Sequence, residues 1–329
     1  MHVLITGAAG FIGSKLSKAL AERGSLGDAA GKPVPISRIT LLDVNEPRPP
    51  PDAAVEMRLQ AGDIRDPEQL RSALTPGTKA VFHLAAVVSG QAEADFDLGM
   101  GINLDGTRTL LDACRELPEP PKLVFPSSVA VFGGEMPEVI RDDTLATPRT
   151  SYGAQKAICE LMINDYTRKG FVDGRVMRLP TISVRPGKPN QAASTFASSI
   201  LREPLQGEQA VCPVPVETGI WIMSPRRVIA ALLHGCDLAA AMWGEQRILN
   251  LAGLTVTVRE MLAAMERAAG TEALERVRME PDQQITRIIT GWPARFDSQR
   301  ALGLGFQADA DMDEVLRIFL EDDRITPGA

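Results

Sequence analysis

The residues with the clearest catalytic potential are Tyr152 and Lys156, which stand four positions apart in the segment YGAQK. At this spacing both side chains lie on one face of a helix. A free tyrosine, with a pKa near ~10, is a poor base at neutral pH, but a nearby ammonium group favours the phenolate. The pair could therefore remove a proton from a substrate hydroxyl. A solvated helix pair is the alternative interpretation, and the surrounding motifs decide between the two.

A glycine-rich motif, TGAAGFIG, follows the apolar run HVLIT near the N-terminus. A strand, a glycine turn and a helix in this order are typical of dinucleotide-binding domains. Gly7 permits a tight turn, Gly10 lets the backbone approach a pyrophosphate, and Gly13 allows close helix–strand packing. Phe11 and Ile12, the first helical residues, would present backbone N–H groups to the phosphates. A simple turn would also need glycines, but their placement here favours a dinucleotide cofactor.

Two downstream aspartates support the same cofactor. Asp43 ends the expected second strand, where a carboxylate can accept hydrogen bonds from the adenosine ribose and would repel a 2′-phosphate, so NAD is predicted over NADP. Arg48 is a feature in favour of NADP. The last glycine of the motif precedes Asp43 by 30 residues, more than the usual 20 or so, and a surface loop at 24–37 would explain the excess. Asp63 and Ile64 are placed to meet the adenine, although an ordinary turn aspartate fits as well.

The first half of the chain alternates short apolar runs with longer amphipathic segments. Strands are predicted at 2–6, 39–43, 55–60, 79–86 and 121–128, with helices between them. This alternation predicts βαβ units and a parallel sheet. The solidly apolar strands indicate helices on both faces. We expect an α/β fold, a Rossmann-like doubly wound parallel sheet with a smaller C-terminal α/β substrate domain.

The predicted domain boundaries follow a change of character after about residue 180. Residues 1–180 are predicted to form the NAD-binding domain, with 218–250 returning to it, and 181–217 and 251–329 to form the smaller substrate-binding domain. The return is predicted because 220–242 has the pattern of another strand and helix. Thr257 and Glu260 have the spacing of a capping box at a helix start.

Composition and charge exclude several classes of protein. Apolar residues make up 44% and charged residues 23% of the 329 residues, and the net charge is −7. An acidic chain without a basic run is poorly suited to nucleic acid, and no apolar stretch reaches the ~18 residues of a membrane-spanning helix. The four cysteines and three histidines lack the spacing of a metal site or a disulfide framework. We therefore expect a cytoplasmic protein without nucleic-acid, membrane or metal partners.

As an ordered set, the motifs TGAAGFIG, LLD, GDIRD, HLAA, NLDGT, FPSSVAVFG and YGAQK resemble the extended short-chain dehydrogenase/reductase family, which contains nucleotide-sugar epimerases and dehydratases. The resemblance implies that Ser128 orients the substrate oxygen beside Tyr152, with Ser127 as a neighbouring candidate. It implies that Lys156 also binds the nicotinamide ribose, and that helices of the Tyr152 type form a homodimer. Further cofactor contacts are implied for Ala85 and the strand exit at 84–88 around it, for Pro180 and for Thr181.

The second half departs from the nucleotide-sugar members of the family. Those members carry an R-x-x-N-x-Y-G-P-like stretch, whereas no asparagine follows Arg178 at the expected place and Phe132 replaces the usual tyrosine. The block RLPTISVRPGKPN at 178–190 and the segments after it are similar to a branch that oxidises D-erythronate at C2 with NAD. The resemblance implies oxidation to 2-oxo-erythronate, with Tyr152 as general base and hydride transfer to NAD.

A small polyhydroxy acid needs a cationic anchor and hydroxyl partners. Arg185 is the candidate anchor, because a guanidinium group binds a carboxylate through two hydrogen bonds; a structural salt bridge is the alternative. Ser89 could reach the substrate from the loop after the fourth strand. Ser194 and Thr195 could do so from the second domain, although capping or surface roles suit them equally well. The arginines at 226–227 are expected to have a solvated or structural role.

Two other functions remain open at this point. A nucleotide-sugar 4-epimerase or dehydratase would use the same tyrosine and lysine but recycle a retained NAD, so that no net NADH accumulates. A non-catalytic dinucleotide-binding sensor would keep the glycine motif, but it would have no need of a tuned tyrosine.

Overall fold

The computed structural model describes residues 1–187 and 193–323, and the chain divides into two compact units. Unit 1 comprises Met1–Ser127, Thr150–Arg178 and Ile229–Leu249; unit 2 comprises Ser128–Arg149, Leu179–Val228 and Asn250–Ala329. The predicted first domain includes 128–149, which the structure groups with unit 2. There Ile140 forms a β-bridge with Phe296 and its N–H donates to the Arg295 carbonyl over 2.9 Å. Parts of the predicted substrate domain, 188–192 and 324–329, lie outside the described residues.

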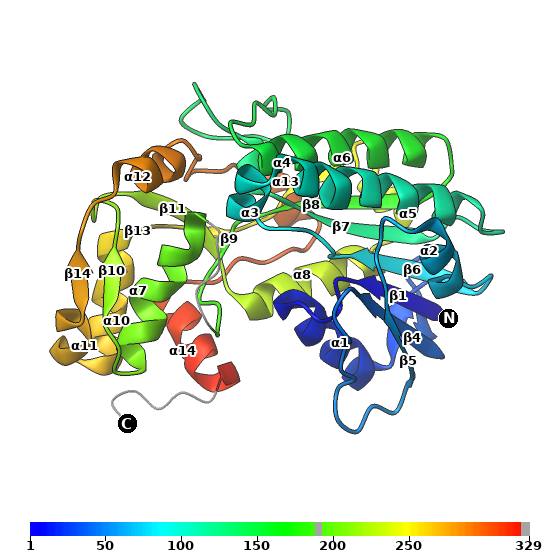
Figure 1. The fold of residues 1–329 in the computed structure, drawn as a ribbon, viewed down its shortest axis with the longest axis horizontal. Helices are drawn as coiled ribbons and strands as arrows, with labels where there is room; N and C mark the ends of the chain where they lie inside the picture. Colours follow the sequence, from blue (N-terminus) through cyan, green and yellow to red (C-terminus); the bar gives the residue numbers. More distant parts are fainter. Residues whose placement is uncertain (188–192, 324–329) are drawn as a thin grey trace. The chain divides into compact units, whose positions relative to one another are not determined.

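Unit 1 is built on a seven-stranded sheet in the order β12-β8-β7-β6-β1-β4-β5 (Figure 1). Its strands are β1 (His2–Thr6), β4 (Arg38–Asp43), β5 (Glu56–Ala61), β6 (Thr78–His83), β7 (Lys122–Ser128), β8 (Asp173–Leu179) and β12 (Ile248–Asn250). β1 pairs in parallel with β4 and β6, β4 with β5, and β6 with β7. Counted along the chain, this is the doubly wound strand order with a seventh strand added. The predicted Rossmann-like sheet is confirmed.

Helices cover both faces of this sheet, as the fully buried β1 requires. The helices of unit 1 are α1 (Phe11–Arg23), α2 (Pro67–Ala73), α3 (Ser89–Ala94), α4 (Phe96–Gly99), the π-helical η1 (Met100–Asp105), α5 (Gly106–Arg115), α6 (Ser151–Arg168) and α9 (Ala240–Trp243). Figure 1 shows α5 and α6 side by side on one face and α1 on the other. Leu4 and Val81 of the sheet share an apolar core with Leu110 of α5 and Ile163 of α6.

The start of α6 is fixed by its own sequence. The Thr150 side chain accepts a hydrogen bond from the Gly153 N–H over 3.1 Å, which caps the helix. Tyr152 therefore lies in the first turn and Lys156 one turn further on. The cap thus fixes the positions of Tyr152 and Lys156 relative to the start of α6.

The segment 24–37, predicted as a surface loop, contains a small antiparallel hairpin instead. Its strands are β2 (Ser25–Gly27) and β3 (Pro33–Pro35). The Gly27 N–H donates to Asp237 Oδ1 over 2.8 Å, so the hairpin is tied to a distant part of unit 1. Prolines and glycines in this segment suggested a loop, but the register of the short strands and this long-range bond stabilise a hairpin.

The strand at 220–223, predicted to return to the main sheet, belongs to unit 2. There β11 (Gly219–Met223) pairs in parallel with β9 (Thr181–Ile182) and antiparallel with β13 (Leu254–Thr257). Ile220 and Ile222 pack into the core of unit 2, which explains the placement. The following helix, α8 (Pro225–Asp237), begins in unit 2 and ends in unit 1.

The rest of unit 2 is mainly helical. Its other elements are η2 (Val129–Val131), η3 (Ala193–Thr195), α7 (Phe196–Leu205), α10 (Val258–Ala269), α11 (Thr271–Glu275), α12 (Gln283–Thr290), α13 (Gln299–Gly303), α14 (Met312–Asp323) and a parallel pair, β10 (Ala210–Cys212) with β14 (Val277–Met279). The predicted capping box is confirmed at the start of α10, where Thr257 and Glu260 each bind the backbone N–H of the other.

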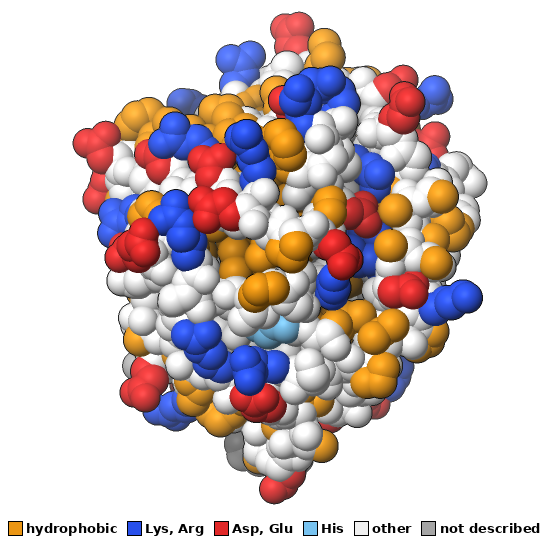
Figure 2. All heavy atoms as spheres, turned by 90° about the vertical axis from the view of Figure 1, so that its right-hand side faces the viewer, with side chains coloured by type: hydrophobic (Ala, Val, Ile, Leu, Met, Phe, Trp, Pro, Cys, Tyr) orange, Lys and Arg blue, Asp and Glu red, His pale blue; other side chains and the backbone are white. Residues whose placement is uncertain are grey.

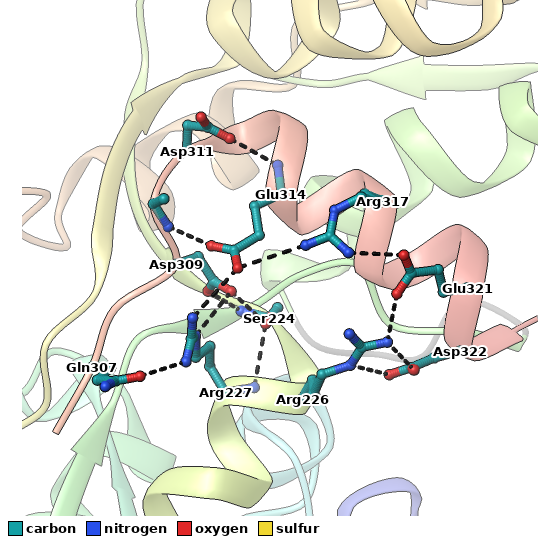
Figure 3. A network of polar contacts seen from close by, with 11 residues as sticks. Ser224, Arg226, Arg227, Gln307, Asp309, Asp311, Glu314, Arg317, Glu321 and Asp322 are labelled. Carbon is teal, nitrogen blue, oxygen red and sulfur yellow. Dashed lines mark hydrogen bonds and ion pairs between the residues drawn. The ribbon is translucent and has the colours of Figure 1, made fainter.

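A polar network ties the start of α8 to the segment before α14 and to α14 itself (Figure 3). Asp309, 3% exposed, accepts hydrogen bonds from the Ser224 N–H and hydroxyl over 2.7 and 2.6 Å. Arg227 donates to Gln307 over 2.8 Å and lies 3.4 Å from Glu314. Arg226 pairs in the same network with the acidic end of α14. Both arginines therefore have the structural role expected from the sequence.

The surface carries mixed charge. Figure 2 shows one face on which Lys and Arg side chains are interspersed with Asp and Glu. Exposed pairs such as Arg71 with Glu68 and Glu116 add little stability. Within 1–187 and 193–323, no helix is long and apolar enough to cross a membrane. In the same ranges, no group of three or more His, Cys, Asp or Glu side chains is arranged to hold a metal ion.

Candidate active site

The glycine motif forms a tight backbone cradle at the end of β1. Gly7 has a φ of 70°, and a Cβ added there would lie 2.5 Å from the Ala85 nitrogen. A Cβ on Gly13 would lie 2.2 Å from the Gly7 carbonyl oxygen. Gly10 precedes α1 and provides no side-chain cap for its first N–H groups. The cradle can be built only with glycine at the two crowded positions. It leads into the start of α1, and the N-terminus of a helix favours a bound anion.

Asp43 is held beside this cradle by the backbone. Its Oδ2 accepts a hydrogen bond from the Ala9 N–H and its Oδ1 from the Asn45 N–H, each over 3.0 Å. Arg48 is exposed. The carboxylate of Asp43 is therefore positioned at the carboxyl end of β4, where it can accept hydrogen bonds from a ribose diol.

A cavity of about 470 Å³ opens at this edge of the sheet, within the size range of ligand pockets. It lies where the strand order reverses between β1 and β6, the usual position of a ligand in doubly wound sheets. The structure brings six of the predicted cofactor residues together in its wall: Gly7, Gly10, Asp43, Asp63, Ile64 and Ala85. Phe11 and Ile12 follow Gly10 as the first two residues of α1.

Part of the cavity wall was not predicted from the sequence. Val87 lies in the predicted strand exit at 84–88, but Gln91, Leu98 and Ile102, on the stretch that runs into η1, also line the cavity. No local motif marks these mostly apolar residues. Their only sequence signal is their position after HLAA and before NLDGT.

Asp63 lies in the wall, but its carboxylate is engaged by Arg65. Asp63 Oδ2 and the Arg65 Nη2 are 2.6 Å apart, and this hydrogen bond lowers the pKa of the aspartate. The Asp63 N–H donates to Gln69 Oε1 over 2.6 Å. Asp63 is thus a well-anchored wall residue whose charge is already balanced.

Tyr152 and Lys156 form the predicted pair on α6. Lys156 Nζ donates to the Pro126 carbonyl over 2.9 Å and lies 4.2 Å from the centre of the Phe125 ring. It lies 5.7 Å from the centre of the Tyr152 ring. Burial lowers the pKa of Lys156 to about 8, and the neighbouring Glu160 acts in the opposite direction. The structure therefore brings Lys156 and the ring of Tyr152 near each other on α6.

The two serines at the end of β7 have different surroundings. Ser127 is buried, and its hydroxyl donates to Glu160 Oε1 over 2.5 Å. Glu160 also pairs with Arg178 at 2.7 Å. The Ser128 hydroxyl accepts a hydrogen bond from the Ala130 N–H over 3.2 Å, an interaction that does not use the hydroxyl hydrogen. Ser127 is therefore part of a buried structural cluster, whereas Ser128 suits the catalytic role better. Ser128 belongs to unit 2.

Unit 2 contains a second, small cavity of about 10 Å³, enough for about one water molecule. Thr181 and Ser194 contribute hydroxyls to a wall that is otherwise largely apolar and includes Trp221. Arg185 Nη2 donates to Ser194 Oγ over 3.4 Å, which places its guanidinium beside a wall residue. Pro180 directly precedes β9. The structure thus groups Thr181, Ser194 and Arg185 in unit 2.

Ser89 lies in unit 1, as the first residue of α3.

His83, at the end of β6, is a buried histidine whose role was not predicted from the sequence. His83 Nε2 bonds with Thr107 Oγ1 over 2.9 Å and Nδ1 with Thr6 Oγ1 over 2.7 Å. Because the Thr107 hydroxyl donates to the Asn103 carbonyl, it accepts from His83, and the ring proton is on Nε2. Burial lowers the pKa of His83 to about 3.

Comparison with known proteins identifies the family of the chain and two similar dehydrogenases. Residues 3–244 match the model of the NAD dependent epimerase/dehydratase family, so the chain belongs to this family and the predicted resemblance is confirmed. It is 56% identical to the D-erythronate dehydrogenase of Cupriavidus necator, over 98% of each chain. It is 45% identical to the D-erythronate dehydrogenase of Haemophilus influenzae, over 98% of this chain and 100% of the relative.

A solved structure shows the same fold over nearly the whole chain. The crystal structure of a nucleoside-diphosphate-sugar epimerase from Agrobacterium tumefaciens superposes with a TM-score of 0.93 at 44% identity. The match covers 98% of this chain and 94% of that one.

Proposed function

We propose that the protein is an NAD-dependent dehydrogenase that oxidises D-erythronate at C2. The products are 2-oxo-erythronate, NADH and a proton. The observation that carries the proposal is the 56% identity to a D-erythronate dehydrogenase across nearly the full length of both chains. A small-molecule substrate and a CH–OH dehydrogenase reaction agree with the residues of the site.

The cavity of unit 1 fits NAD. The cradle excludes any Cβ at Gly7 and Gly13, as expected where a backbone must approach a pyrophosphate. In the proposal, the N–H groups after Gly10, including those of Phe11 and Ile12, bind the phosphates, and Asp43 binds the adenosine ribose. Asp63 and Ile64 contact the adenine in this proposal, and Ala85 lines the dinucleotide. Lys156 binds the nicotinamide ribose. Pro180 and Thr181 contact the nicotinamide carboxamide.

The catalytic roles are assigned to three side chains. Tyr152 accepts the proton of the C2 hydroxyl, Lys156 favours the phenolate that can do so, and Ser128 holds the reacting oxygen by a hydrogen bond. NAD, when bound, accepts the hydride from C2. Arg185 binds the substrate carboxylate and Ser89 a hydroxyl group.

The test is NADH formation, followed by absorbance, when purified protein is mixed with NAD and D-erythronate. L-Threonate and a UDP-hexose serve as parallel substrates, and NADP replaces NAD in a matched series. We expect NADH only with D-erythronate and NAD. Absence of NADH with both acids would overturn the proposal.

A second candidate is a nucleotide-sugar 4-epimerase, favoured by the 44% identity to a structure described as a nucleoside-diphosphate-sugar epimerase. Interconversion of the UDP-hexose without net NADH would support it. Binding of NAD without any reaction would instead point to a sensor.

We also propose a homodimer in the cytoplasm. Ile158 and Leu161 stand three positions apart on α6 and are 41% and 68% exposed, which gives this helix an apolar outer stripe. All four cysteines are buried and unpaired, as suits a reducing compartment. Light scattering should give the mass of a dimer for the wild type and of a monomer for Leu161→Glu. A wild-type monomer would contradict the dimer.

A further inference from the structure

The side chain of Asn103 holds the part of the cofactor-cavity wall around Val87 in place. Val87 lines the cavity, and its N–H donates to Asn103 Oδ1 over 2.9 Å. Asn103 Nδ2 donates in turn to the Val87 carbonyl over 3.2 Å. Asn103 lies in η1 and is 3% exposed. Because only the amide oxygen can accept from the Val87 N–H, the orientation of the Asn103 side chain is determined.

The same amide is bound by the helix that carries the catalytic pair. Asn103 Nδ2 also donates to Gln155 Oε1 over 2.8 Å. Gln155 is 1% exposed and stands on α6 between Tyr152 and Lys156, directly before the lysine. Its oxygen must face Asn103, because its own NH₂ group would meet another donor. Hydrogen bonds through Asn103 therefore connect Gln155 of α6 with Val87 in the cavity wall; the wall around Val87 is called the Val87 wall below.

A second contact from α6 fixes the backbone of Asn103. The Cys159 thiol donates to the Asn103 carbonyl over 3.2 Å, and the Thr107 hydroxyl donates to it over 2.6 Å. Cys159 stands four positions after Gln155, on the same face of the helix. The π-helical geometry of η1 alters the regular helical bonding pattern, and π-bulges are frequent at functional sites. Both the side chain and the backbone carbonyl of Asn103 are thus hydrogen-bonded to residues of α6.

Gln155 keeps a buried polar group that its contacts do not satisfy. Its Nε2 has no hydrogen-bond partner among the described residues. It packs so closely on Gly99 that a Cβ added there would lie 2.6 Å away. An unpaired buried donor lowers stability. Stability alone therefore gives no reason for an amide at this position.

We propose that Gln155 is a positioning residue that acts through Asn103 to place the Val87 wall of the NAD cavity relative to Tyr152 and Lys156. The proposal rests on NAD binding at this cavity, but not on the identity of the substrate. Loss of the Gln155 oxygen frees Asn103 on one side, so the wall can shift while the sheet and α6 stay folded. A shift of the wall weakens NAD binding and misaligns the catalytic pair with the cofactor.

The experiment compares NAD affinity, melting temperature and steady-state kinetics of the full-length protein and its Gln155→Met variant. Calorimetry should show an NAD dissociation constant raised about tenfold, the cost of about one hydrogen bond. The kcat should fall as well, since displacements of about 1 Å at such sites can cost about 100-fold in rate. The melting temperature should change little, because one unpaired buried donor, on Gln155, is exchanged for another, on Asn103. Gln155→Glu, which keeps an oxygen acceptor, should recover part of the affinity.

Lys122→Met is the matched control. Lys122 is 5% exposed, its Nζ donates to the Gly27 and Cys236 carbonyls in unit 1, and it is not among the residues that line the cavity. This variant should lower the melting temperature and leave NAD affinity unchanged. In an Asn103→Ala background, Gln155→Met should have no further effect on affinity.

Three outcomes would overturn the proposal: unchanged NAD affinity in Gln155→Met, a lower melting temperature as its only effect, or a full additional loss of affinity in the Asn103→Ala background. If the wild type binds NAD but does not oxidise D-erythronate, the substrate assignment fails. The comparison of NAD affinities still decides the role of Gln155 in that case.

Discussion

Mild acid should destabilise unit 1 through two buried histidines. His2 is 5% exposed, with Nδ1 2.6 Å from Thr78 Oγ1 and Nε2 2.8 Å from Thr40 Oγ1. Burial, with a smaller contribution from Arg38, lowers its pKa from 6.5 to about 4. Burial, with a smaller contribution from Lys156, lowers the pKa of His83 to about 3. Both rings are therefore neutral in the folded state under conditions that protonate them in the unfolded chain.

The sign and size of the effect follow from these values. Above pH 6.5 both states hold the histidines neutral, so stability is unaffected; below it the unfolded state takes up protons first and is favoured. Each pH unit below 6.5 then costs about 1.4 kcal/mol per histidine, until the folded pKa is reached. Between pH 7 and pH 5 the loss is about 2 kcal/mol for each ring, or about 4 kcal/mol together. That is a large share of a typical domain stability of about 5–15 kcal/mol.

The assay is urea-induced unfolding at pH 7 and pH 5, followed by circular dichroism, with hydrogen exchange of β1 peptides to assign the transition to unit 1. In His2→Gln the loss between the two pH values should fall by about half, because one titrating ring is removed. Thr78→Val serves as the control: it should be less stable at both pH values but keep most of the pH dependence. Equal pH dependence in the wild type and His2→Gln would refute the argument.

Other predictions concern single side chains of the two units. Tyr152→Phe should reduce kcat about 100- to 10,000-fold while NAD affinity by calorimetry stays unchanged; near-normal turnover would remove Tyr152 from its role. Asp43→Ala should raise the Michaelis constant for NAD about tenfold and reduce the ratio of kcat/KM for NAD to that for NADP. An unchanged ratio would contradict the contact between Asp43 and the ribose. Thr257→Ala should lose about 1 kcal/mol of unfolding free energy in urea, with NAD affinity intact; no loss would show that the capping box is dispensable.

The sheet of unit 1 was predictable because its inner strands are almost fully buried, whereas the edge strand β5 is largely half-buried or exposed. Runs such as 2–6 and 121–128 leave little choice but a strand covered on both faces, and the structure follows them closely. The cradle was predictable for a different reason, since only glycine fits at Gly7 and Gly13. The spacing of Tyr152 and Lys156 similarly identified one face of α6.

Other features depend on long-range pairing that local patterns do not encode. The strand and helix at 219–237 were recognised as elements, but nothing in their sequence tells that β11 pairs with Thr181–Ile182 rather than with the main sheet. The link between Asn103 and Gln155 joins residues 52 positions apart. Both residues stand inside recognised motifs, yet their contact is visible only once η1 and α6 are packed together.

The interleaving of the two units has a consequence for biosynthesis. The chain enters unit 2 at Ser128, returns at Thr150, leaves again at Leu179 and comes back at Ile229. One of the two edge strands of the large sheet, β12, ends at Asn250. A nascent chain on the ribosome therefore cannot complete the large sheet until about three quarters of the protein has been made. For the same reason, no stop codon or protease cut can release either unit as one uninterrupted fragment.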